Sequence, residues 1–302
     1  MTTPLRVANA PCSWGVLEFE GQGDALPYTQ VLDEMAAAGY EGTEFGDWGF
    51  LPTDPVALSD AVAARGLTLL AAFVPVAFAD VAAHAPGRAK ALKVARLLAA
   101  AAGTTPFIVL ADDNGTVPAR TTRAGRITEA DGLSTGGWAT FARGVELVAG
   151  AVADETGLRT VFHPHCAGYV EAPWEVDRLL DATDPARVGL CYDTGHLVFG
   201  GADPLAVLAR HGDRVWHVHF KDCHPQVAAQ SRGDAWDYFA AVRHGVFCEL
   251  GRGAVDFAAV VAALECSGYE GWIVVEQDVL PGLGTPAQSA SRNRDFLRSL
   301  GL

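Results

Sequence analysis

The chain has 302 residues, of which half are hydrophobic and 19% are charged, so it can bury a sizeable core and is not expected to be disordered. Its net charge of −14, without any basic run, argues against a nucleic-acid partner, because binding nucleic acid requires a surface that neutralises phosphates. The sequence begins without the basic start and apolar run of a signal peptide, and its apolar stretches are too short to span a bilayer. We therefore expect a cytoplasmic protein that does not bind membranes.

Short apolar runs alternate with longer stretches of helical periodicity along the whole chain. Many of the helical stretches open with Pro or end at Gly, the usual start and stop signals of helices. In chain order, strands are predicted at Arg6–Ala10, Gly42–Phe45, Thr68–Phe73, Phe107–Ala111, Thr160–His163, Val188–Tyr192, Val215–His219 and Trp272–Glu276. Helices are predicted at Tyr28–Ala38, Pro55–Ala64, Pro86–Ala102, Trp138–Thr156, Trp174–Ala182, Pro204–His211, Asp256–Ser267 and Ala287–Leu300.

This order of elements predicts a single-domain α/β fold, a (β/α)8 TIM barrel over residues 1–302. The alternative, a doubly wound open sheet, usually carries a Gly-rich phosphate turn after its first strand. Here the first strand runs into Ala-Pro-Cys-Ser-Trp-Gly, which lacks that pattern. A polar stretch at about 112–136 is expected to be a long loop, of the kind that forms lids or subunit contacts in barrels.

Polar side chains gather at the carboxyl ends of the predicted strands, and in a barrel these ends share the rim where active sites lie. The residues concerned are Glu44, His163, His165, Asp193, His196, His217, His219, Lys221, Asp222, Glu276 and Asp278. Mixed carboxylate and imidazole ligands suit a divalent transition ion better than Ca²⁺. The pattern therefore predicts a metal site built from several strands.

Strand alternation leaves two choices open. His163 and His165 point to the same side of a strand if the strand continues, and so do His217 and His219. One member of each pair is expected to bind the metal, and the other to hold substrate or support a ligand. Asp193 follows an apolar run, as does Glu276, so each carboxylate has to be paired, hydrogen-bonded or metal-bound.

Other candidate residues carry weaker signals. Trp14 and Trp48 flank strand ends and are equally consistent with a sugar-stacking wall and with the core. Glu44 could also serve only to pair or cap at the rim. Cys166 follows His165, but nothing in the pattern indicates a nucleophile. The six cysteines include no Cys-x-x-Cys pair and are expected to be reduced.

The chain resembles the xylose-isomerase-like barrel superfamily, the sugar phosphate isomerase/epimerase group, and within it the inosose (2-keto-myo-inositol) dehydratase branch. The resemblance covers most of the chain and rests on the segments Asn9–Gly15, Gly39–Gly46, His163–Glu171, Asp193–His196, His217–Asp222 and Val275–Asp278. It implies one metal ligand on each of the last four strands. Asp193, His219 and Glu276 match the last three of these, and His163, or else His165, replaces the Glu that many members carry on the fifth strand.

The resemblance also implies roles around the metal. His196 and Lys221 are expected to face substrate oxygens, and Glu171 corresponds loosely to a substrate-contacting position. The expected substrate-binding set is Trp14, Glu44, Glu171 and His217. The cofactor is expected to be one divalent ion, Mn or Co first, with Zn, Fe, Ni or Mg as alternatives. Members of the group often form dimers or tetramers, so a homo-oligomer is expected here.

The missing strand-five Glu bears on the reaction, because epimerases of this group use two metal-bound Glu residues on opposite faces of the substrate. A one-sided elimination needs one base and one acid. We therefore expect a metal-dependent lyase that dehydrates a small keto-cyclitol or keto-sugar through an enediolate. The base is Glu276, His165 or Glu44, and the acid is Lys221 or His196.

Several alternatives remain at this stage. β-Elimination of a 3-keto-glycoside is a variant of the same chemistry. A ketose isomerase or epimerase would use the same ion, and a phosphorylated substrate is disfavoured because only Lys221, Arg232 and Arg252 lie near the relevant strands. A non-catalytic sugar-binding barrel is disfavoured by the near-complete ligand set. A nuclease of the same superfamily is disfavoured by the acidic charge.

Overall fold

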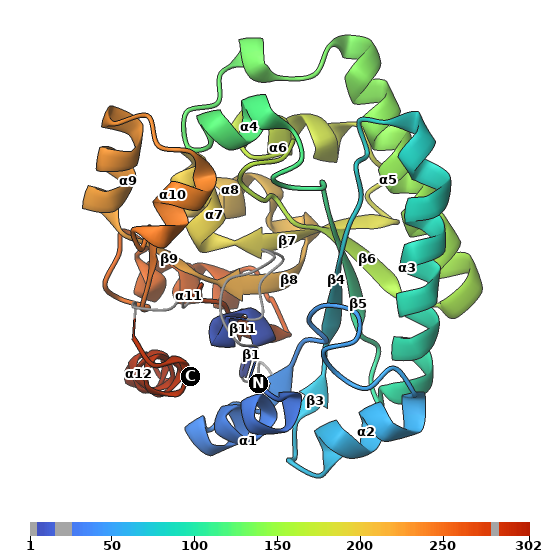
Figure 1. The fold of residues 1–302 in the computed structure, drawn as a ribbon, viewed down its shortest axis with the longest axis vertical. Coiled ribbons are helices and arrows are strands. Elements are labelled where there is room, and N and C mark those ends of the chain that lie inside the picture. Colours follow the sequence, from blue (N-terminus) through green and yellow to red (C-terminus); the bar gives the residue numbers. More distant parts are fainter. Residues whose placement is uncertain (1–4, 16–25, 279–283) are drawn as a thin grey trace.

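A nine-stranded parallel sheet, rolled into a barrel, forms the centre of the computed structural model, which describes residues 5–15, 26–278 and 284–302 (Figure 1). The strand order is β3-β2-β1-β11-β8-β7-β6-β5-β4. Its two outer strands, β3 (Thr68–Leu69) and β4 (Ala71–Pro75), are halves of one segment interrupted only at Leu70. Leu70 N donates to Thr43 O at 3.0 Å and Leu70 O accepts from Phe107 N at 2.8 Å, which closes the ring. The predicted (β/α)8 barrel is confirmed, with its third strand split in two.

The remaining barrel strands are short, and each is paired in parallel with its neighbours. They are β1 (Arg6–Asn9), β2 (Gly42–Thr43), β5 (Phe107–Ala111), β6 (Arg159–Phe162), β7 (Val188–Asp193), β8 (Val215–Phe220) and β11 (Trp272–Val275). Between β7 and β8 the register shifts: Leu190 lies opposite Val215, but Cys191 lies opposite His217. Trp216 is therefore an extra residue, and this β-bulge sets His217 and His219 in register with Cys191 and Asp193.

Eight helices cover the outside of the barrel at the expected places in the chain (Figure 1). They are α1 (Tyr28–Ala38), α2 (Pro55–Ala63), α3 (Val81–Ala101), α5 (Thr135–Thr156), α6 (Pro173–Asp181), α8 (Pro204–His211), α11 (Phe257–Cys266) and α12 (Pro286–Ser299). The predicted start of α3 at Pro86 was wrong. Asp80 caps the helix by accepting from Ala82 N at 2.9 Å, so the helix begins before Pro86 and contains it. Likewise, the side chain of Ser134 caps α5, which begins at Thr135 rather than Trp138.

Additional elements lie on the carboxyl-end side of the barrel. They are η1 (Pro11–Trp14), α4 (Pro118–Arg123), η2 (Glu129–Asp131), α7 (Thr194–Phe199), α9 (Pro225–Gly233), α10 (Tyr238–Arg243) and the antiparallel pair β9 (Asp222–Cys223) and β10 (Phe247–Cys248). The short η3 (Gly212–Arg214) lies instead at the amino end of β8. A small second core that contains Cys166, Phe199, Tyr238 and Phe247 lies among α7, α9, α10 and the β9–β10 pair. The segment 112–136, predicted as a long loop, is thus partly helical, because α4 and η2 pack over the barrel end.

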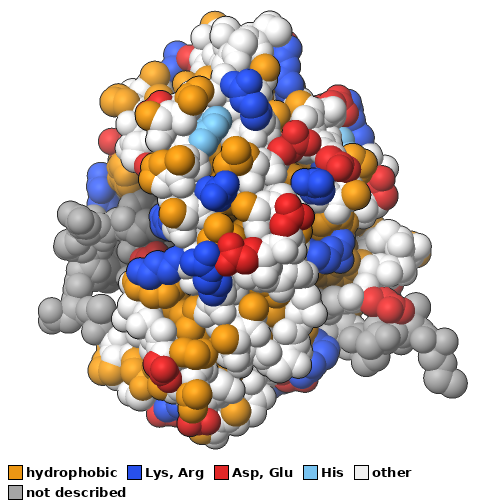
Figure 2. Space-filling model, turned by 90° about the vertical axis from the view of Figure 1, so that its right-hand side faces the viewer, with side chains coloured by type: hydrophobic (Ala, Val, Ile, Leu, Met, Phe, Trp, Pro, Cys, Tyr) orange, Lys and Arg blue, Asp and Glu red, His pale blue; other side chains and the backbone are white. Residues whose placement is uncertain are grey.

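Small apolar residues fill the interior of the barrel, including Ala8, Val109, Val161, Cys191 and Val274. A larger apolar layer lies between the strands and the outer helices. On the face formed by α3 and α5, acidic and basic side chains are interspersed (Figure 2). In the part of the chain that the structure describes, no helix combines the length and apolarity that crossing a bilayer requires. The six cysteines are free thiols.

Candidate active site

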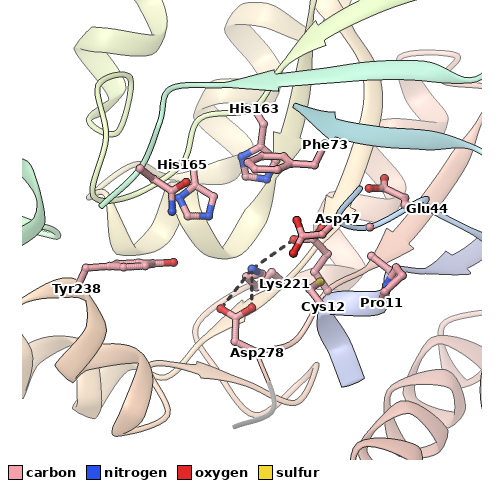
Figure 3. Close-up of a pocket in the computed structure, with 14 residues that line it drawn as sticks. Pro11, Cys12, Glu44, Asp47, Phe73, His163, His165, Lys221, Tyr238 and Asp278 are labelled. Atoms are coloured by element: carbon pink, nitrogen blue, oxygen red, sulfur yellow. Dashed lines mark hydrogen bonds and ion pairs between the residues drawn. The ribbon is translucent and has the colours of Figure 1, made fainter. Parts of the chain in front are cut away.

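A cavity opens at the carboxyl ends of the strands (Figure 3). Its wall is formed by residues that follow β1, β2, β5, β6, β8 and β11, together with Phe73 of β4 and Tyr238 of α10. The lining residues are Ala10, Pro11, Cys12, Glu44, Gly46, Asp47, Phe73, Asn114, His163, His165, Lys221, Tyr238, Glu276 and Asp278. Because most of the strands contribute side chains at their ends, residues distant in sequence meet here.

Four predicted metal ligands converge at the base of this cavity. His163 follows β6, Asp193 ends β7, His219 lies on β8 and Glu276 follows β11, and one ligand atom from each lies within 4.8 Å of the others. Asp193 Oδ2 is 3.4 Å from His163 Nε2 and 3.8 Å from His219 Nδ1. His219 Nδ1 is 3.4 Å from Glu276 Oε1. Such spacings suit atoms that surround one ion at roughly 2.1 Å.

The buried atoms of this cluster indicate that a cation fits between them. Asp193 Oδ2 and His219 Nδ1 are buried and have no hydrogen-bond partner within the described residues. Burial alone would raise the pKa of Asp193, but the nearby imidazole of His163 and the charge of Lys221 hold it at about 2. Burial would lower the pKa of His219, yet Cys191, Glu276 and Glu44 hold it well above its usual range. The position therefore attracts positive charge, and its N/O donor set suits a divalent transition ion.

Glu44 lies beside the cluster and is bonded to two histidines. Its Oε1 is 2.7 Å from His217 Nε2 and 2.9 Å from His219 Nε2. Burial would raise the pKa of Glu44, but His219 and the two hydrogen bonds hold it far below its usual range. A carboxylate engaged in this way is a poor general base, so the expectation that Glu44 removes the substrate proton is not supported.

His217 was predicted to bind substrate, but its position does not favour this role. It does not line the active-site cavity; it lies on the other side of Glu44 and borders a separate hollow with Arg159 and Trp216 at the amino end of the barrel. The bulge at Trp216 explains this position, because it turns His217, together with His219, into the barrel interior below the rim.

Lys221 lies at the centre of a second polar group on the cavity wall (Figure 3). Its Nζ is 3.3 Å from Glu276 Oε2, 3.4 Å from Asp278 Oδ1 and 3.3 Å from His196 Nε2. Burial would lower the pKa of Lys221, but Asp278, Glu276 and Asp193 outweigh it and hold the pKa well above its usual range. The side chain is therefore an ammonium and can act as a proton donor.

His165 and His196 stack face to face, with ring centroids 4.0 Å apart. His165 Nδ1 donates to Cys166 O at 2.8 Å, which leaves its Nε2 free to accept a proton. His196 Nδ1 accepts from Cys166 N at 3.2 Å, so the proton of the neutral ring is on Nε2. This N–H and the Lys221 ammonium, 3.3 Å apart, are both donors and do not bond to each other. Burial, the neighbouring histidines and Lys221 lower the pKa of both rings, which keeps them neutral. We call His163, Asp193, His219 and Glu276 the ligand cluster; His165 lies outside it, and both His163 and His165 line the cavity.

Two further residues predicted to contact substrate, Trp14 and Glu171, lie outside the cavity lining. Trp14 is 3% exposed, packs into the main core and donates its indole N–H to Glu34 at 2.7 Å. Glu171 is buried beneath α4, where it accepts from Gly125 N and Ala167 N at 2.6 and 2.9 Å. Trp48 also lies outside the cavity lining, with Lys93 Nζ 3.8 Å above its ring. Large or charged side chains near strand ends are not all directed into the cavity, and the local helices and caps decide which ones are.

The sequence analysis missed other parts of the wall. Asp47, Asn114 and Tyr238 line the cavity, but none of them ends a predicted strand. Tyr238 belongs to α10, a helix that the strand-and-helix pattern did not reveal. Asp278 stood out as a strand-end carboxylate, although no role was given to it. Its contact with Lys221 depends on the turn after β11, which periodicity does not specify.

The comparisons with known proteins agree with this geometry. The model of the xylose isomerase-like TIM barrel family matches residues 32–300, and the chain belongs to that family. An inosose dehydratase of Lacticaseibacillus casei is 33% identical over 297 residues, covering 98% of this chain and 97% of the relative. An inosose dehydratase of Geobacillus thermodenitrificans (strain NG80-2) is 33% identical over 300 residues, covering 97% and 96%. The chain is therefore an enzyme.

Solved structures show the same fold at lower identity. The 3-keto-D-glucoside 4-epimerase of E. coli superposes with a TM-score of 0.69 at 16% identity, covering 98% of this chain and 100% of that one. A D-allulose 3-epimerase from Methylomonas sp., in complex with D-allulose, gives 0.69 at 20% identity with 99% of each chain covered. At these identities the likeness concerns the fold alone.

Proposed function

We propose that this enzyme is a metal-dependent lyase that dehydrates a keto-cyclitol, as the name inosose dehydratase describes for its relatives. One observation carries the proposal: the ligand cluster shares a cavity with a neutral histidine and a buried ammonium group. These are the three components that a metal-assisted elimination needs, namely an electrophile site, a base and an acid. We also place the enzyme in the cytoplasm and expect a homodimer or homotetramer.

The metal would be held by His163, Asp193, His219 and Glu276. When bound, a divalent ion supplies Lewis-acid polarisation of the substrate carbonyl and its neighbouring hydroxyl. Mn or Co is expected first, with Zn, Fe, Ni or Mg as alternatives, since imidazole and carboxylate ligands together suit the transition ions.

His165 is proposed as the base and Lys221 as the acid. The free Nε2 of His165 takes the proton from the carbon next to the carbonyl, and the C–H electron pair forms the new double bond. The C–O bond to the β-hydroxyl breaks, and Lys221 gives that oxygen a proton so that it leaves as water. His196, whose Nε2 is 3.3 Å from Lys221 Nζ, is the alternative donor, although it lies behind Lys221 and does not itself line the cavity. Glu276 is the alternative base, but its two oxygens already face His219 and Lys221.

The charge of the wall favours an uncharged substrate. Among the described lining residues, Glu44, Asp47, Glu276 and Asp278 are acidic, Lys221 is the one Lys or Arg, and that lysine is already paired with two carboxylates. A phosphate group would meet repulsion here rather than the basic cluster or helix start that usually binds it. A neutral polyhydroxylated ketone instead finds hydroxyl, amide and carboxylate partners.

A ketose isomerase or epimerase is the second candidate function. It is favoured by His165 and Glu276, which both line the cavity and offer two possible bases. β-Elimination of a 3-keto-glycoside would use the same groups. These reactions differ in their products: dehydration removes one water, epimerisation leaves the mass unchanged, and glycoside elimination releases a second molecule.

The test is a product analysis with 2-keto-myo-inositol in the presence of Mn²⁺ or Co²⁺. We expect a product lighter by one water, with new ultraviolet absorbance from a conjugated carbonyl, and no product after chelation. A product of unchanged mass would replace the dehydratase by an epimerase. Unchanged substrate with either ion would overturn the keto-cyclitol assignment.

Replacing Lys221 by Met tests the acid. We expect kcat to fall about 10²- to 10⁴-fold, the usual contribution of a general acid, while the metal content stays that of the wild type. Lys90→Met is the matched control, since Lys90 lies on the outer helix α3 and donates to Pro75 O. A Lys221→Met enzyme with wild-type kcat would assign the proton donation to His196 instead.

A further inference from the structure

We propose that Glu44 and His217 are positioning residues that hold His219 with Nδ1 directed at the metal. Neither the names of the relatives nor the proposed reaction assigns a role to this pair. The inference rests on the proposed metal site but not on the identity of the substrate. It replaces the substrate contacts expected for both residues by a structural chain, His217–Glu44–His219, that runs from the barrel interior to the ligand cluster.

The chain depends on one shared oxygen atom. His217 and His219 are two residues apart on β8 and face inward together because of the bulge at Trp216. Glu44, which follows β2, reaches them from the opposite part of the barrel wall, and its Oε1 accepts from both Nε2 atoms at 2.7 and 2.9 Å. All three side chains are at most 4% exposed. In this dry setting water cannot replace a lost partner.

The hydrogen bond to Glu44 decides which nitrogen of His219 is available. A carboxylate only accepts, so the proton of His219 that faces Glu44 is on Nε2. Nδ1 is then the nitrogen that can give its lone pair to a metal, and it is the atom that lies 3.4 Å from Glu276 Oε1 and 3.8 Å from Asp193 Oδ2. Histidine ligands of metals are commonly fixed in this way by a carboxylate on their other nitrogen.

His217 acts one step further away. Its N–H is the second bond to Glu44 Oε1, and its ring lies 5.4 Å from that of Phe107, centroid to centroid, which limits its movement. Without His217, Glu44 would keep one of its two anchors and could turn toward the cavity that it lines. Loss of Glu44 should therefore weaken metal binding more than loss of His217.

The experiment measures the affinity of the whole protein for Co²⁺ by competition with a chelator, and the visible absorption of bound Co²⁺. We expect affinity to fall about 100-fold in Glu44→Ala and about 10-fold in Glu44→Gln, which keeps an acceptor but loses the charge. The affinity of His217→Phe for Co²⁺ should also be about 10-fold lower. His217→Gln keeps a hydrogen-bond donor at the same reach, so its affinity should be close to that of the wild type. Asp47→Asn is the matched control, because it removes a carboxylate from the same cavity wall without a side-chain contact to His219.

A spectroscopic readout separates positioning from general destabilisation. In the Zn²⁺-loaded wild type, nitrogen-15 spectra should show His219 protonated on Nε2 and perturbed on Nδ1, and Glu44→Ala should lose this signature. Melting curves of the metal-free variants check that each one folds. If Glu44→Ala does not fold, Glu44→Gln is the variant that tests the positioning role.

The outcomes are distinguishable. If the wild type binds Co²⁺ and Glu44→Gln and His217→Phe bind it as tightly as Asp47→Asn does, the positioning role is wrong and the metal site stands. A Zn²⁺-loaded wild type with His219 protonated on Nδ1 would also overturn it. If the wild type binds neither ion, the metal site and this inference both fall.

Discussion

Two clusters of buried polar side chains lie at the carboxyl end of the barrel, and they differ in how completely their hydrogen bonds are satisfied. Beneath α4, Arg120 donates to Gly168 O at 2.8 Å and to Glu175 Oε2 at 2.6 Å. Both oxygens of Glu171 accept from backbone N–H groups, and Glu175 Oε1 is the one atom of these three side chains that lacks a partner within the described residues. We call Arg120, Glu171 and Glu175 the α4 anchor.

The ligand cluster has the opposite character. Asp193 Oδ2 and His219 Nδ1 are equally buried, have no hydrogen-bond partner among the described residues, and lie close to each other. Buried polar groups are normally satisfied, so unsatisfied ones that converge need an explanation outside the protein chain. The comparison shows that burial of charge does not by itself mark a site. The α4 anchor, satisfied except at one oxygen, holds two segments together, whereas the unsatisfied atoms of the other cluster converge on one point and favour a bound ion there.

Asp193→Asn should give the largest effect and would sharpen this comparison. Losing a charged ligand should abolish stoichiometric metal binding and reduce activity by about 10³-fold or more, since a metal supplies several kcal/mol of charge stabilisation. The free energy of unfolding of the metal-free protein should also fall at neutral pH, because His163, Lys221 and His219 stabilise the ionised form of Asp193 in the folded state. Metal analysis, steady-state kinetics and urea unfolding measure the three quantities.

The matched control for this variant is Asp203→Asn. Asp203 caps α8 by accepting from Leu205 N, just as Asp193 caps α7 by accepting from His196 N, but it lies outside the cluster. The Asp203→Asn variant should keep both its bound metal and its activity. A full metal content in Asp193→Asn would break the comparison, because the unsatisfied atoms would then have no role in binding.

Arg120→Ala should have the second-largest effect, on stability. Removing one partner of a buried ion pair typically costs about 3–5 kcal/mol, and both side chains of the Arg120–Glu175 pair are at most 1% exposed. The folded fraction should bind metal as the wild type does. Urea unfolding is the measurement, with Arg123→Ala as control, since its pair with Asp131 is partly exposed and worth at most about 1 kcal/mol. A folded variant of wild-type stability that loses metal would reverse the roles given to the two clusters.

The smallest expected effect concerns pH. Burial raises the pKa of Glu171 from 4.5 to about 7 in the folded protein, against the backbone hydrogen bonds that lower it. The native state then binds more protons than the unfolded state between these values. The stabilisation is present below pH 4.5 and is lost as the pH rises through 7, by about 3 kcal/mol at most.

Unfolding by urea at a series of pH values measures this contribution as the difference between the wild type and Glu171→Gln. The stability advantage of the wild type should shrink as the pH rises from about 4.5 to about 7. Glu129→Gln, an exposed change on the nearby η2, should leave the wild-type profile unchanged. A constant difference between the wild type and Glu171→Gln would show that Glu171 stays ionised, as expected if its two hydrogen bonds dominate over burial.

Strand periodicity predicted much of this site. Asp193, His219 and Glu276 each follow or end an apolar run, and a closed barrel leaves the ends of its parallel strands only one rim on which to meet. The choice between His163 and His165 was not decided in this way, because two residues on the same side of an extended strand are equivalent. β6 ends at Phe162, so alternation no longer applies beyond it, and the turn places one ring in the ligand cluster and the other outside it.

The sequence by itself determined the barrel, the order of its strands and helices, and the residue types that gather at its rim, because these follow from local periodicity and from chain closure. Only the tertiary structure decided which polar residues serve the site. Trp14 lies in the core and Glu171 lies under α4 because each bonds to a partner distant in sequence. Glu44 and His217 are paired because a one-residue bulge at Trp216 turns His217 inward. Hydrogen-bond satisfaction in a buried setting depends on neighbours from several elements at once, and no single segment of the sequence contains that information.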